Sequence, residues 1–166
     1  KVHNVPSIIK NPPLQGLPTR EMESFSPLAL GLSVIIDYDR QVLLMGSPLP
    51  VESADVELPL RMYRLAMVPG HVQGGPVSFI LDTGGQVISI STDTASGLER
   101  GEMRNIPLKV YGASGWDRDA FLMPGVNLNF TSKIEYRNLS VVVLNLRAPS
   151  VLLGFRLGGI VGYKFL

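Results

Sequence analysis

The chain has 166 residues, of which 45% are apolar and 17% charged, so it is neither disordered in composition nor short of material for a packed core. Its net charge is +1 and its fifteen Lys and Arg residues are scattered, which argues against nucleic acid or an anionic membrane as a partner. Cysteine is absent, which excludes disulfides and thiolate chemistry, and the apolar runs are too short for a membrane span of about twenty residues.

The N-terminal part is predicted to be mostly loop with one hairpin. A short strand is expected at 5–9, followed by a polar, Pro-rich stretch through Ser26. Two apolar, β-branched runs at 33–36 and 41–45 flank four polar residues, a pattern typical of a β-hairpin. Segment 46–55 contains two prolines and is the best candidate for a linker.

The rest of the chain is predicted to be a succession of short strands with one helix. Residues 56–62 alternate apolar residues with polar or turn residues, as in a strand with one buried face. A short helix is expected to begin with Thr92 as its N-cap and to contain 95–98. Further strands are predicted at 65–68, 77–81, 87–91, 106–111, 126–130, 139–144 and 151–153. Many short strands of this kind indicate a mostly-β barrel or sandwich.

A short internal sequence repeat suggests two lobes. Residues 2–9 and 136–143 share a pattern of apolar positions with Asn at the same place. This repeat predicts that residues 1–50 are the tail of a preceding lobe or an N-terminal extension with a β-hairpin. Residues 51–166 are predicted to form another lobe. The start at Lys1, without Met or a signal peptide, suggests a processed or trimmed polypeptide, and we expect both ends to be cut.

The segment 77–85 carries the most specific chemical signal. A buried strand runs into Asp82, where desolvation can tune a carboxylate, and a turn begins immediately after it. Gly84 and Gly85 allow a tight turn and the close approach of a ligand, and Thr83 offers a hydroxyl for a buried partner. His3 and His71, the two imidazoles, are far apart and match no metal motif, so each is interpreted as a satisfied or solvated histidine.

From 58 to 166 the sequence resembles the retropepsin-like aspartic peptidases, especially the bacterial family related to retroviral gag-polyprotein peptidases. Three features appear in the family's order. The first is the hydrophobic-Asp-Thr-Gly signature at 79–84, and the second is a Gly-rich segment at 111–116, where the family has a flap hairpin. The third is the apolar-apolar-Gly segment within 159–166, which in the family packs beneath the catalytic loop.

Each feature also has a plainer interpretation. Residues 82–85 suit an ordinary hairpin turn, and 112–115 suit a simple loop. The Gly-rich run 158–162 fits no phosphate-binding loop and indicates close backbone packing. Aromatic residues such as Tyr111 and Trp116 are more often core residues than substrate contacts.

The resemblance implies a retropepsin-like or pepsin-lobe-like closed β-barrel over 51–166, with one or two short helices. It implies an aspartic endopeptidase in which Asp82 supplies one carboxylate of a water-activating dyad, with Thr83 and Gly84 completing the catalytic loop. It further implies a peptide or protein substrate, no metal or cofactor, and a secreted or periplasmic location. The substrate-binding residues would be Gly85 and the flap residues Tyr111, Gly112, Ala113, Ser114, Gly115 and Trp116.

One Asp-Thr-Gly is half of such a site, because the other Asp residues lack its context. The second carboxylate would come from a homodimer partner or from a missing lobe of the same protein. Gly85 and Gln86 depart from the small Ala-Ser or Ala-Asp usual after the signature. The alternative is therefore a catalytically inactive peptidase-like module that binds peptide or mediates assembly.

Overall fold

The computed structural model describes residues 27–50, 53–63, 65–98, 106–112 and 115–166. The chain divides into two units, Lys1–Ala54 and Asp55–Leu166. The strand expected at 5–9 lies outside the described residues. The helices in the described part lack the length and apolar character that crossing a membrane requires.

The first unit contains a short 3-10 helix, η1 (Pro27–Leu30), and an antiparallel hairpin of β1 (Ser33–Asp37) and β2 (Val42–Gly46). The hairpin predicted from the two apolar runs is therefore confirmed. Its turn is fixed by the Asp37 side chain, whose Oδ1 accepts a hydrogen bond from the Arg40 amide at 2.8 Å.

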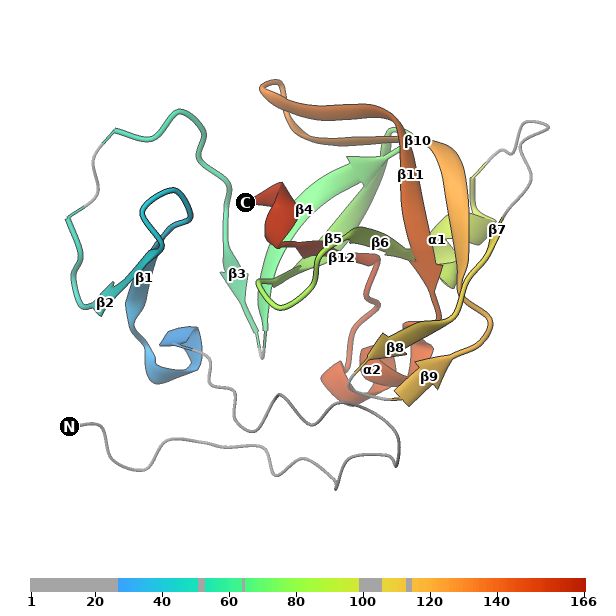
Figure 1. Cartoon of the computed structure of the whole chain (residues 1–166), viewed down its shortest axis with the longest axis horizontal. Helices are drawn as coiled ribbons and strands as arrows, with labels where there is room; N and C mark the ends of the chain where they lie inside the picture. The colour runs from blue at the N-terminus through green and yellow to red at the C-terminus, as the bar shows by residue number, and fades with distance from the viewer. Residues whose placement is uncertain (1–26, 51–52, 64, 99–105, 113–114) are drawn as a thin grey trace. The chain divides into compact units, whose positions relative to one another are not determined.

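The second unit is a closed β-barrel, as the sequence predicted (Figure 1). Its strands follow the order β3-β4-β5-β12-β6-β11-β10-β7, and a further pairing between β4 and β10 closes the ring. The bounds of the strands are β3 (Arg61–Met62), β4 (Ala66–Val72), β5 (Gly75–Asp82), β6 (Ile88–Ser91), β7 (Ile106–Pro107), β10 (Phe121–Thr131), β11 (Ile134–Leu144) and β12 (Gly159–Gly162). The remaining elements are the hairpin strands β8 (Val110–Gly112) and β9 (Gly115–Asp117), two short helices α1 (Thr92–Ser96) and α2 (Arg147–Leu153), and η2 (Tyr163–Phe165).

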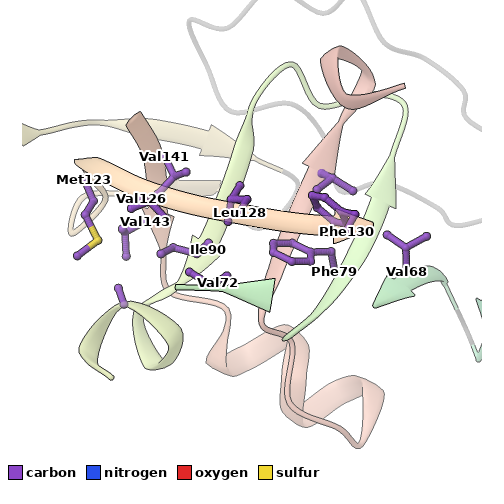
Figure 2. Close-up of a cluster of buried hydrophobic side chains, with 12 residues drawn as sticks. Val68, Val72, Phe79, Ile90, Met123, Val126, Leu128, Phe130, Val141 and Val143 are labelled. Atoms are coloured by element: carbon purple, nitrogen blue, oxygen red, sulfur yellow. The ribbon is translucent and has the colours of Figure 1, made fainter. Parts of the chain in front are cut away.

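The core fills the barrel interior (Figure 2). Along β5 the side chains alternate, so Phe79 packs inside the barrel while Ile80 joins a second apolar cluster with residues that flank α2. The Phe79 ring lies against Phe130 with the ring centroids 5.1 Å apart. Because β5 is buried on both faces by this arrangement, its carboxyl end has a fixed position in the barrel.

Two predicted strands are shorter than expected or interrupted. Of residues 56–62, only Arg61 and Met62 pair with a neighbour, although Leu58 still packs against the core. Pro59 has no amide to donate to a ladder, which disfavours strand pairing there. The strand predicted at 106–111 is divided into β7 and β8, which pair with different partners.

The strand predicted at 151–153 is wrong, because these residues end helix α2. Pro149 lies in the first helical turn, where a missing amide costs little. Gly154 ends the helix with a left-handed φ of 77° and donates its amide to the Ser150 carbonyl. A three-residue apolar run does not distinguish strand from helix, and these flanking signals decide the outcome.

The predicted helix after β6 is confirmed, but its boundaries differ from the prediction. Its N-cap is Ser91 rather than Thr92, because the Ser91 hydroxyl accepts the Thr94 amide at 3.0 Å. The helix ends at Ser96, so Leu98 lies beyond it, although the Leu98 side chain still packs against the core.

Replacing Phe79 with Ala should lower the free energy of unfolding by about 3–5 kcal/mol, because a fully buried ring is removed and leaves a cavity. Chemical denaturation would measure this loss. Val151→Ala is the control, since that side chain is 74% exposed and its truncation should change stability by less than about 0.5 kcal/mol. Equal losses in the two variants would contradict the assignment of Phe79 to the core.

Candidate active site

Asp82 is the last residue of β5 and is half-buried. Its position is set by β12, which pairs with β5 in parallel and places Gly162 beside Asp82. Strand β12 also pairs with β6, so the strand beneath the carboxylate is itself held on both edges. The carboxylate therefore lies at the carboxyl end of a strand that is paired with a neighbour on each edge.

The turn after Asp82 orients its side chain. Oδ1 accepts a hydrogen bond from the Gly84 amide at 2.9 Å, and the Asp82 carbonyl accepts one from the Gly85 amide at 3.1 Å. A Cβ on Gly84 would lie 3.3 Å from Oδ1, and one on Gly85 would lie 3.1 Å from Oδ2. The two glycines thus keep both oxygens clear of neighbouring side-chain carbon, so a water or a substrate group can reach them.

The C-terminal Gly-rich segment packs beneath this loop, as the sequence predicted. The Tyr163 amide donates to the Gly85 carbonyl at 2.8 Å. A Cβ on Gly162 would collide with the Gly85 carbonyl and lie 2.9 Å from the Val87 amide nitrogen. Gly162 is thus required by the close approach of two backbones, which is the packing interpretation of the 158–162 run.

The residues that follow Asp82 remain open to solvent. Thr83 and Gly84 are exposed, and in the described part of the chain the Thr83 hydroxyl has no hydrogen-bond partner. Gln86 is also exposed, and half of the Val87 surface is accessible. One side of the loop packs against β12 and the residue after it, and the other side is exposed to solvent.

Other carboxylates near sequence features of interest bind backbone amides. Asp37 caps the turn of the β1–β2 hairpin. Asp117 accepts backbone amides through both of its oxygens. The source of a second carboxylate for Asp82 remains a prediction.

The segment predicted as a flap is a hairpin. Strands β8 and β9 pair antiparallel, with Tyr111 opposite Trp116 and Gly112 opposite Gly115. Ala113 and Ser114, which lie between the two strands in the sequence, are outside the described residues. A contact between this hairpin and a substrate remains a prediction.

A separate polar hollow was not anticipated from the sequence. It measures about 410 Å³ and is lined by His71, Gln73, Gly74, Asn127, Leu128, Asn129 and Glu135. These residues come from β4, β10, β11 and the turn before β5. Because β5 starts at this turn and ends at Asp82, the hollow lies at the opposite end of the strand from the carboxylate.

Residues 68–165 match the protein family described as "Aspartyl protease". The chain belongs to the aspartyl protease family. The match covers most of β4, all of β5, β6, β10, β11 and β12, the Asp82 loop and the segment that packs beneath that loop. The family resemblance drawn from the three sequence features is thereby confirmed.

One solved structure similar to this aspartyl protease family member is that of EIAV protease complexed with the inhibitor HBY-793. The two chains are 17% identical, with a TM-score of 0.44, and the alignment covers 70% of this chain and 91% of the viral one. No curated protein matches the sequence.

Replacing Gly162 with Ala should displace the Asp82 loop and lower the free energy of unfolding by about 1–3 kcal/mol. The added Cβ would meet backbone atoms of Gly85 and Val87, which cannot rotate away. NMR chemical shifts of residues 82–87 and chemical denaturation would measure the two effects. Gly75→Ala is the matched control, since its Cβ would lie 3.4 Å from the nearest heavy atom. Unchanged loop shifts in Gly162→Ala would contradict this packing.

Proposed function

We propose that the chain forms one half of the active site of an aspartic endopeptidase, in which Asp82 supplies one of two water-activating carboxylates. The observation that carries the proposal is the position of Asp82. It begins an Asp-Thr-Gly sequence at the carboxyl end of β5, within the part of the chain that matches the family. Its Oδ1 is held by the Gly84 amide, and both oxygens are free of neighbouring Cβ atoms. A preorganised and accessible carboxylate is what general acid–base catalysis requires.

The proposed chemistry depends on a second carboxylate a few ångströms away. Two such groups cannot both ionise at low cost, so the pair retains one proton. The ionised member takes a proton from the bound water as the water attacks the scissile carbonyl carbon, and the protonated member polarises the carbonyl oxygen. The apparent pKa values then belong to the pair rather than to either Asp.

The solvent exposure of the loop supports the proposal that a second loop completes the site. Thr83 and Gly84 are accessible at the edge of the half-buried carboxylate, where a second Asp-Thr-Gly loop would have to approach. We propose that this loop comes either from a second copy of the chain or from another lobe of the same protein. The separate compact unit formed by the N-terminal residues supports the second source, as the tail of such a lobe.

We further propose that the β8–β9 hairpin acts as the flap. A hairpin that forms a sheet of its own can close over a peptide without breaking the barrel ladder. Residues Tyr111 to Trp116 would then cover an extended peptide, pair with its backbone and exclude water from the reacting carbonyl. Gly85, at the edge of the catalytic loop, would lie under the same peptide.

Asp82→Asn should abolish cleavage, because an amide cannot take a proton from water. The assay is hydrolysis of an unfolded protein such as casein at acid pH by the full-length protein, with and without pepstatin. Asp39→Asn, in the exposed turn of the β1–β2 hairpin, is the control and should retain activity. Residual cleavage by the Asp82 variant would refute the catalytic role. A wild-type protein that binds peptide without cleaving it would favour the inactive module.

Thr83→Ala should lower kcat/KM by about tenfold, because the proposal gives its exposed hydroxyl a hydrogen-bond partner on the second loop. Thr83→Ser keeps the hydroxyl and should restore most of the activity. Steady-state kinetics of the two variants at several protein concentrations would also identify the second loop. Specific activity that falls on dilution indicates a second copy, and constant activity indicates a lobe of the same protein. Equal activity of Thr83→Ala and wild type would contradict a role for the hydroxyl.

A further inference from the structure

The β8–β9 hairpin is joined to the barrel at its base by both backbone and side-chain hydrogen bonds. The Leu108 amide donates to the Ala120 carbonyl at 2.8 Å and continues the β7–β10 pairing toward the hairpin. Among the described residues, β8 and β9 pair only with each other, as a sheet separate from the eight-stranded one. The hairpin's last residue, Asp117, pairs with Val110 at the base of the hairpin. The hydrogen bonds that fix the direction of the hairpin therefore lie at this base.

Asp117 contacts two different parts of the chain through its two carboxylate oxygens. Oδ1 accepts the Asp119 amide at 3.0 Å and shapes the turn that follows β9. Oδ2 accepts the Asn145 amide at 3.0 Å, twenty-eight positions further along the chain. The first bond is an ordinary local turn, but the second spans from the hairpin to the wall of the barrel. Because the acceptor is a carboxylate, both are charge-assisted hydrogen bonds.

The residue at the other end of this bond has a fixed position. Asn145 lies between β11 and α2, and its own Oδ1 accepts the Arg147 amide at 3.1 Å in the first turn of the helix. The next residue, Leu146, is 7% exposed and packs in the apolar cluster that contains Ile80 of β5. The Asn145 amide therefore belongs to the rigid barrel and can serve as an anchor for a less constrained hairpin.

We infer that Asp117 is a positioning residue that fixes the base of the β8–β9 hairpin to the β11–α2 junction and so, together with the Leu108–Ala120 backbone bond, limits the direction of the hairpin. This inference rests on the proposed function, because it treats the hairpin as the element that covers the peptide. Asp117 does not contact the reacting atoms in this scheme. It limits the range of directions that the hairpin samples, which reduces the entropy lost when the hairpin orders over a substrate.

The first test is hydrogen–deuterium exchange of the full chain, comparing wild type with Asp117→Ala and Asp119→Ala. Loss of the Asp117 carboxylate should accelerate exchange of the Asn145 amide by about tenfold or more, and exchange of the hairpin amides in the same direction. Amides of β5 should be unaffected. Asp119→Ala is the matched control, because it removes a neighbouring exposed carboxylate while keeping the backbone amide that Asp117 binds. Unchanged exchange at Asn145, or equal acceleration in β5, would overturn the anchor.

The second test is kinetic and separates flap positioning from a purely structural role. Asp117→Ala should raise KM several-fold with a smaller change in kcat, and Asp117→Asn should fall between that variant and wild type because its amide retains one oxygen acceptor. An unchanged KM in a variant whose hairpin exchanges faster would overturn the assignment of Asp117 to flap positioning. A wild-type chain that cleaves nothing would refute the proposed function, whereas exchange at Asn145 decides the anchor by itself.

Discussion

The close approach of β12 to the loop after Asp82 is the contact on which the candidate site depends. Strand β12 pairs with β5 and β6, and Gly162 has no side chain to hold the Gly85 carbonyl away. Interdigitated protein interiors resist small displacements, so a loop seated on backbone is held more firmly than one seated on flexible side chains. The orientation of the carboxylate by the Gly84 amide follows from this support.

The residues that stabilise the barrel differ from the residues that are proposed to carry the chemistry. Its interior is filled by fully buried residues such as Phe79, Leu128 and Val143, which take no part in the proposed reaction. The proposed chemistry lies on a loop at the end of β5, where Thr83 and Gly84 are exposed to solvent. Preorganisation of a reactive group by a rigid scaffold lowers the reorganisation needed during catalysis. In the proposed assembly, a second loop would complete a site whose first half already has a fixed geometry.

Much of the fold could be predicted because its signals are local. The apolar run before Asp82 predicts β5, and the glycines after it predict the turn that follows the strand. Residues 151–153 were misassigned because a short apolar run fits a strand or a helix, and the deciding contacts involve Gly154 and the Ser150 carbonyl. The Asp117–Asn145 bond could not be predicted, because its partners are far apart in sequence and nothing local marks them. The second carboxylate is beyond prediction from this chain alone.

The seam between β4 and β10 closes the barrel with two residue pairs, whereas β4 and β5 share six. Gln73, in the turn after β4, adds three hydrogen bonds to β10 at this seam. Its amide donates to the Asn127 carbonyl at 3.0 Å, its Nε2 donates to the Gly125 carbonyl at 3.2 Å, and its Oε1 accepts from Asn127 Nδ2 at 3.2 Å. The seam borders the polar hollow and lies at the start of β5, away from Asp82. One glutamine therefore reinforces the short closure of the ring, and its loss would loosen the barrel at the start of β5 without removing the backbone contacts beneath the acidic loop at the other end of the strand.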